Sequence, residues 1–111
     1  MEISIIDTIV ISRDYTPSPG ARNIDEGEYS GEQFLNTVLL PKFEKALNQN
    51  YRILIDLDNT EGYATSFLEE AFGGLARKYG AEKVLKHLEF KSDDEPLLKD
   101  EILSYISEAN K

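Results

Sequence analysis

Two hydroxyl side chains stand next to each other where a predicted strand, turn and helix follow one another. Thr65 and Ser66 open an apolar helical stripe, and Ser66 has the S-x-x-E spacing of a capping box with Glu69. Ser66 could act only as the helix N-cap, its oxygen accepting a backbone amide. Alternatively, a phosphoryl group on either hydroxyl would lie at the positive end of the helix. Such a group adds roughly two negative charges and could switch a binding surface.

Carboxylates form a second group in the same stretch. Asp56 and Asp58 are two residues apart at the end of the predicted strand, so they share one side of it, and Glu61, Glu69 and Glu70 follow. Their oxygens could hold Mg²⁺, or could raise one another's pKa for acid–base catalysis. Simpler roles are also open, because Asp58 suits a turn and first-turn acids complement the helix dipole.

A long loop could supply a positive charge to pair with these carboxylates. Residues 13–29 are rich in Pro, Gly and acids, and a loop of that length is mobile or functional. Gly20 would allow the backbone to come close to another group. Arg22 could pair bidentately with Asp56 or Glu69 and hold the loop over the helix start, or it could receive a phosphate.

The first helix is predicted from Ser30 to about residue 48. Ser30-Gly31-Glu32-Gln33 is a capping box, with Glu32 as an ordinary first-turn acid. Pro41 lies inside this helix and should kink it or split it in two. The apolar face consists of Phe34, Leu35, Val38, Leu39, Phe43 and Leu47.

Three segments of the chain are predicted to supply the strands that position these groups. Residues 52–58 begin as an unbroken apolar run, the pattern of a strand covered on both faces. Residues 3–11 form a strand with a bulge, or a short hairpin turning at Asp7-Thr8. Residues 83–91 form a third strand, whose lysines suit the sheet edge, with His87 exposed in it.

Two more helices complete the predicted domain. One runs from Phe67 to Tyr79 and closes at Gly80, with Gly73-Gly74 marking a close packing contact; the other begins near Pro96 and runs to the end. Strands alternating with helices imply parallel pairing through right-handed crossovers. We therefore expect one α/β domain over residues 1–111, with a mixed or mostly parallel sheet of about four strands and about three flanking helices.

Composition limits the function. Asp and Glu number 21 against 12 Lys and Arg, a net charge of -9, and no basic cluster appears, which disfavours nucleic-acid binding. There is no cysteine, and no apolar run approaches the roughly 20 residues of a membrane helix. We expect a cytoplasmic protein without a cofactor, since nucleotide-binding glycine motifs are also missing.

Several short motifs carry a resemblance to a known family. Gly20-x-Arg22, Ser30-Gly-Glu-x-Phe34, Asp56-Leu-Asp58 and the string SFLEEAFGGL beginning at Ser66 resemble the STAS-like domain family of unknown function, DUF4325. The strand, turn and hydroxyl pair are more distantly similar to the STAS domain of anti-sigma factor antagonists. The resemblance implies a bacterial regulatory domain that binds a kinase with a histidine-kinase-like ATPase fold. It also implies that this kinase phosphorylates Thr65 or Ser66.

We therefore predict a non-enzymatic signalling module that binds a protein partner and no membrane. Its contact face would comprise residues 62–70, from Gly62 to Glu70, together with the loop of residues 20–30. An alternative is a small metal-dependent or ligand-binding enzyme that uses Asp56, Asp58 and Glu69. A third possibility is a purely structural subunit.

Overall fold

The computed structural model describes residues 3–109, and its centre is one small parallel sheet. Strands β1 (Ile5–Val10), β2 (Arg52–Asp56) and β3 (Leu88–Lys91) lie in the order β1-β2-β3, and both pairs are parallel. The predicted α/β class and the parallel pairing are confirmed. The sheet has three strands within residues 3–109, not the four that we predicted.

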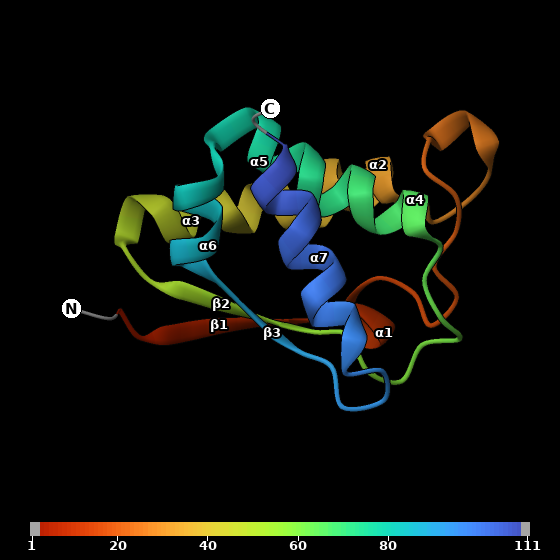
Figure 1. The fold of residues 1–111 in the computed structure, drawn as a ribbon, viewed down its shortest axis with the longest axis horizontal. Helices are drawn as coiled ribbons and strands as arrows, with labels where there is room; N and C mark the ends of the chain where they lie inside the picture. The colour runs from red at the N-terminus through yellow and green to blue at the C-terminus, as the bar shows by residue number, and fades with distance from the viewer. Residues whose placement is uncertain (1–2, 110–111) are drawn as a thin grey trace.

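Strand β1 resolves the first open alternative. It is a single strand whose register with β2 shifts between Ile5 and Asp7, so the bulge is present and the hairpin is not. The strand ends one residue before the short helix α1 (Ile11–Asp14). A second short helix, η1 (Ile24–Glu26), lies in the long loop and projects from the body of the domain (Figure 1).

The first long helix contains a wide turn next to its proline. It comprises α2 (Gly31–Phe34), the π-helical η2 (Leu35–Leu39) and α3 (Leu40–Gln49). The Leu40 amide bonds to the Leu35 carbonyl, five residues back. Because Pro41 has no amide hydrogen, the regular ladder must change here. The predicted interruption therefore takes the form of a π turn rather than two separate helices.

The second long helix follows the same plan. It comprises α4 (Thr65–Leu68), the π-helical η3 (Glu69–Gly73) and α5 (Gly74–Tyr79). Its predicted apolar stripe is confirmed, because Leu68, Ala71, Phe72 and Leu75 are fully buried. Gly80, at φ 95°, ends this helix as predicted and also stands directly before α6 (Ala81–His87).

The predicted strand over residues 83–91 is wrong in its first half. Residues up to His87 belong to α6, and only Leu88–Lys91 pair with β2, as an edge strand. His87 is 4% exposed, not a solvent-facing strand residue. Its Nδ1 lies 2.9 Å from the Tyr51 carbonyl oxygen, and its ring packs edge-on against Phe43. The lone histidine therefore has a structural place in the core.

The last helix, α7 (Leu97–Glu108), packs against η3. Leu98, Ile102 and Ile106 are buried, as the predicted stripe requires, whereas Leu97 is 79% exposed. Among the helices that the structure describes, none is both long and apolar enough to cross a membrane.

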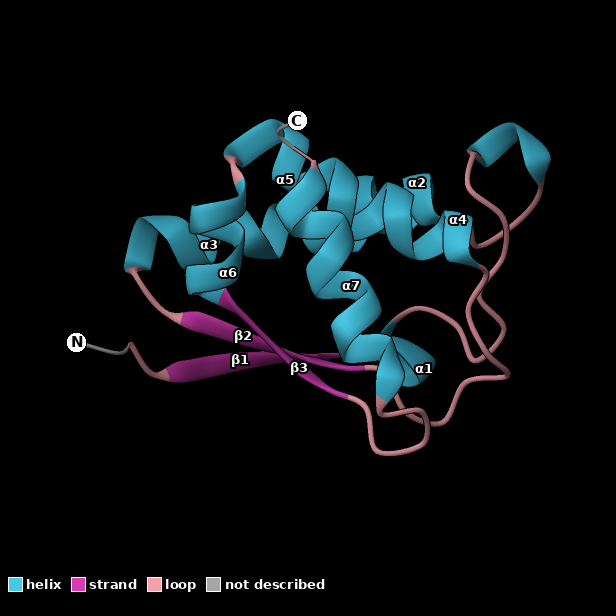
Figure 2. Cartoon of the chain, viewed as in Figure 1, coloured by secondary structure: helices cyan, strands magenta, loops and turns pink. Residues whose placement is uncertain are grey.

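The helices form one layer over the sheet (Figures 1 and 2). Burial along β2 alternates: Ile53 and Ile55 are buried, and the residues between and beside them are only half-buried. Leu88 and Phe90 continue the buried side on β3. The prediction that β2 is covered on both faces is wrong. Its apolar run suggested two covered faces, but helices cover only one face of the sheet.

Candidate functional site

Arg22 joins the long loop to the start of the second long helix. Its Nη1 lies 2.7 Å from Glu69 Oε1 and 3.3 Å from Glu70 Oε1. The guanidinium is about one-third exposed, and both carboxylates are more buried than that. The predicted pairing of Arg22 with Glu69 is confirmed, but a single nitrogen spans two acids instead of forming a bidentate fork. Asp56 is not one of its partners.

Backbone hydrogen bonds hold the same loop in place. The Gly31 amide donates to the Ala21 carbonyl, and the Glu32 amide donates to the Arg22 carbonyl, both at 2.9 Å. The Glu32 carboxylate accepts the Ile24 amide at 2.9 Å, so this acid anchors the loop as well as opening a helix. The loop between β1 and α2 is thus a defined part of the site.

Two glycines permit close contacts around this loop. A Cβ on Gly20 would collide with the Glu28 carbonyl oxygen, so the close approach predicted there is present. A Cβ on Gly31 would stand 2.5 Å from the Phe67 carbonyl oxygen. The starts of the two long helices therefore touch through backbone. Ser30 is fully buried and its hydroxyl accepts the Gln33 amide at 3.0 Å, so the predicted cap forms.

Glu69 sits between two arginines. One oxygen faces Arg22, and Oε2 lies 2.5 Å from Nη1 of Arg77 in α5. The hydrogen bond from Arg77 is the main reason that the pKa of this carboxyl lies below its usual range; partial burial opposes that effect and Arg22 reinforces it. The charge of Glu69 is therefore largely compensated inside the protein, at a π turn of the kind often found at functional sites.

The hydroxyl pair lies at the head of this helix. Thr65 is exposed and Ser66 is partly buried, while the N-cap is Ala64, without a side-chain cap. The prediction that Ser66 is the N-cap is wrong, because the helix begins at Thr65, two residues earlier than the S-x-x-E spacing indicates. Burial first, and the Glu101 carboxylate second, raise the pKa of Tyr105, and the Thr65 hydroxyl acts in the opposite direction. Thr65 therefore lies beside α7.

Asp58 binds the end of β3 and the loop that follows it. It is 5% exposed, its Oδ2 lies 2.6 Å from Lys91 Nζ, and its Oδ1 accepts the Asp94 amide at 2.9 Å. Burial raises the pKa of this carboxyl, but the Asp94 amide and Lys91 together outweigh burial and leave the pKa lowered. Asp56 accepts the Asp58 amide at 3.0 Å. These contacts are those of a structural turn.

The proposed carboxylate group is not assembled. Among residues 3–109, no three acidic, histidine or cysteine side chains are gathered so that they could hold a metal ion. Asp58 is paired with Lys91, and Glu69 is paired with two arginines. The structure therefore brings together Gly20, Arg22, Ser30, Gly31, Glu32, Glu69 and Glu70, and it leaves Asp56 and Asp58 with the β3–α7 loop. Gly62, at φ 120°, lies in the turn between these two places.

Sequence reasoning missed Arg77 and Tyr105. Arg77 is eight residues from Glu69, beyond the usual three- or four-residue spacing of helical ion pairs. The Gly73-Gly74 pair was the available signal, because a Cβ on Gly73 would lie 2.6 Å from Glu69 Oε2. Nothing in the sequence placed Tyr105 near Thr65.

The fold and the site define the class of protein. A small parallel sheet under one helical layer is compatible with a small STAS-like domain. The chain belongs to the STAS-like domain family of unknown function (DUF4325), whose family model matches residues 30–98, more than half of its length. No curated protein and no solved structure matches the chain.

Proposed function

We propose that this single STAS-like domain is a regulatory module that binds a protein partner and carries out no catalysis of its own. The partner would be a kinase with a histidine-kinase-like ATPase fold, and phosphorylation of Thr65 or Ser66 would control binding. A switch that depends on ATP would place the domain in the cytoplasm. Family membership supports the regulatory class.

The contact between Arg22 and the two acids carries this proposal. It makes residues 20–30 and residues 62–70 parts of one continuous surface, although they are far apart in the chain. Tyr29 and Ile24 add exposed apolar area to this surface. A defined loop that presents apolar side chains beside a helix start suits recognition of a protein better than enclosure of a small substrate.

The local charges also support a phosphoryl group at the hydroxyl pair. Glu69 follows Thr65 by four residues and Glu70 follows Ser66 by four, so each acid shares a helix face with one hydroxyl. Unpaired, these acids would repel a phosphate. Arg22 compensates both, and Arg77 compensates Glu69 again. A phosphoryl group would compete with the acids for Arg22, which would loosen the loop and alter the surface.

The test is a tagged pull-down from the native cells with the intact mass of the bait recorded. We expect a co-purifying ATPase and a bait fraction that carries one phosphoryl group. The phosphoryl group should be absent from the Thr65→Ala/Ser66→Ala variant. The matched control is Ser104→Ala/Ser107→Ala, which removes two exposed hydroxyls of α7 instead. Partner capture and phosphate that persist unchanged in Thr65→Ala/Ser66→Ala would contradict the switch.

A second variant tests the surface independently of the phosphate. Arg22→Gln should weaken partner capture even when both hydroxyls are present, because it separates the loop from the helix. Capture that survives Arg22→Gln and is lost in Thr65→Ala/Ser66→Ala would restrict the interface to the helix start.

A further inference from the structure

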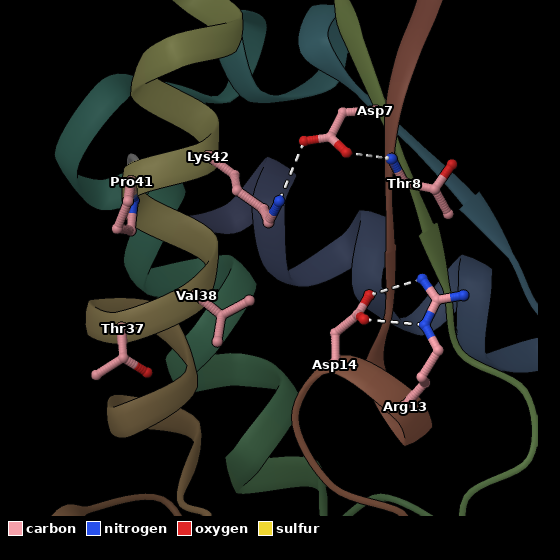
Figure 3. A pocket seen from close by; sticks show the side chains of 8 residues that line it. All are labelled: Asp7, Thr8, Arg13, Asp14, Thr37, Val38, Pro41 and Lys42. Atoms are coloured by element: carbon pink, nitrogen blue, oxygen red, sulfur yellow. Dashed lines mark hydrogen bonds and ion pairs between the residues drawn. The ribbon is translucent and has the colours of Figure 1, made fainter.

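On the edge of β1 that does not pair with β2, two carboxylates accept the backbone amides. The Thr8 amide donates to Asp7 Oδ1, and the Val10 amide donates to Asp14 Oδ2, both at 2.8 Å. These side chains lie on the side of β1 that faces away from β2 (Figure 3). Amides of alternate residues on an edge strand are the groups with which an added strand pairs. At both positions a side chain occupies the place of that strand.

Each carboxylate also forms an ion pair with a basic side chain. Lys42 Nζ of α3 lies 3.3 Å from Asp7 Oδ2, and Arg13 contacts both oxygens of Asp14 at 3.0 and 3.2 Å. These side chains are partly exposed, so the contacts are labile ones. The carboxylates can therefore leave the two amides without unfolding any part of the core.

A groove runs beside this edge. It has a volume of about 500 Å³ and lies between β1 and the π turn and α3 of the first long helix (Figure 3). Val38 and Pro41 provide apolar surface across from the strand, and Thr37 provides a hydroxyl. The helical layer thus reaches past the sheet at the position of a fourth strand, and the sheet has only three strands within residues 3–109.

We propose that this edge is a strand-addition site for an extended segment of a partner protein with basic residues at positions i and i+2. The carbonyls of that segment would accept the amides of Thr8 and Val10 in place of the carboxylates. Each displaced carboxylate loses one donor, and a basic side chain of the segment restores it. Because the two amides are two residues apart, the basic side chains must alternate in the same way. The net charge of -9 favours the same partner.

The site is separate from the surface proposed above for the kinase. None of its residues belongs to residues 20–30 or 62–70, so either proposal can fail while the other stands. The competing explanation is permanent edge protection, in which the carboxylates only prevent aggregation. The experiment must distinguish displacement of the carboxylates from permanent closure.

The probe is a fluorescein-labelled octapeptide of alternating Lys and Thr, with blocked ends. We expect fluorescence anisotropy to show saturable binding, at least about tenfold tighter than for a Glu–Thr octapeptide of the same length. The amide resonances of Thr8 and Val10 should move on titration. A Lys–Thr peptide N-methylated at every residue keeps its charge, but its methyl groups block both edges of the extended chain, so it should lose the binding.

Two matched variants separate edge pairing from general attraction. Asp7→Asn/Asp14→Asn and Asp25→Asn/Glu28→Gln change the net charge equally, but the second pair lies in the long loop. The first pair should bind the Lys–Thr peptide about tenfold more weakly, and the second should bind like wild type. Thr8→Pro removes one outward amide at an edge position that tolerates proline, and it should also weaken binding.

Three results would overturn the proposal. They are absence of binding to the wild type, equal binding by the two charge-matched variants, and equal binding of the N-methylated peptide. The first result leaves permanent edge protection as the role of Asp7 and Asp14. If Thr8→Pro does not fold, the peptide comparison and the charge-matched pair still decide.

Discussion

Arg77 reaches Glu69 across Gly73, a residue that has no side chain to separate them. Arg77 Nη1 lies 2.5 Å from Glu69 Oε2, and a Cβ on Gly73 would stand 2.6 Å from that oxygen and 3.2 Å from that nitrogen. The wide turn of η3 and the bare Gly73 together bring into contact two side chains eight residues apart. The interior glycine, unfavourable for a helix, thus has a specific use here.

Gly73→Ala should therefore loosen the ion pair without unfolding the domain. The atoms in its way are the ends of two flexible side chains, which can move aside. Alanine also favours the helix by up to about 1 kcal/mol, so we expect stability to change by no more than about that amount. The pKa of the Glu69 carboxyl should rise toward its ordinary value. Titration by NMR together with thermal unfolding checks both results, and an unmoved pKa would contradict the contact.

Gly31→Ala should behave in the opposite way. The new Cβ would meet the backbone of Phe67, with the carbonyl oxygen at 2.5 Å and the Cα at 3.0 Å, and backbone cannot move aside. We expect the free energy of unfolding to fall by about 1–3 kcal/mol as the two helix starts separate. Denaturant unfolding measures this loss, and Gly73→Ala is the matched control because it is the same substitution in the other long helix. Equal stabilities for the two variants would refute the backbone contact.

The sequence was informative where one pattern dominated a long segment. Phe34, Leu39 and Phe43 recur at helical spacing and are buried as predicted. The run around Ile53 and Ile55 has the β-branched character of a central strand, and it lies at the centre of the sheet. Both signals come from burial of apolar surface, which local spacing records directly.

The segment around His87 shows why prediction failed elsewhere. The buried residues Val84, His87 and Leu88 have helical spacing, but Val84, Leu88 and Phe90, which are also buried, fit the alternation of a strand. Gly80 ends one helix and stands directly before the next, so no loop composition separated them. Which structure formed depended on pairing of Leu88–Lys91 with β2, a contact more than thirty residues away in the chain.

The sequence predicted only the contact between the long loop and the start of the second long helix. Arg22 was recognised as a partner for Glu69 because loop arginines seek acids at a helix start. The role of Glu70 as a second acceptor, the reach of Arg77 and the caps on the amides of β1 depend on side-chain geometry that no spacing rule contains. The sequence therefore identified the region of the site but only part of its contacts.

The Glu69–Arg77 pair should make stability depend on pH in a defined window. Because the folded state lowers the pKa of Glu69, the pair contributes in full above the unfolded pKa and is lost as pH falls through the folded pKa. Arg77→Gln should thus be less stable than wild type at pH 7 by about 0.2–1 kcal/mol, the range of partly exposed pairs. The difference should disappear at low pH. Urea unfolding across pH tests this, and a difference that grows on acidification would have the wrong sign.

Asp58→Asn should destabilise the loop between β3 and α7. The carboxylate accepts the Asp94 amide and pairs with Lys91 while it is almost fully buried, and an amide cannot satisfy both as well. We expect a loss of about 1–3 kcal/mol, typical of a buried hydrogen bond to a charged group. Hydrogen exchange should locate the change at Asp94 and Asn59. Asp93→Asn is the control, since Asp93 also contacts Lys91 but is exposed.

Arg22→Gln should free the long loop while the fold remains intact. The variant loses the contacts with Glu69 and Glu70 but keeps the backbone bonds from Gly31 and Glu32. A loss of about 1 kcal/mol in loop closure corresponds to roughly fivefold more of the open form. Cleavage by a glutamate-specific protease at Glu26 or Glu28, both exposed, should accelerate by about that factor while opening is fast. Arg77→Gln removes the other partner of Glu69 and does not touch the loop, so its cleavage rate should match wild type. Equal acceleration in both variants would mean that the whole helix opens, and that Arg22 does not hold the loop by itself.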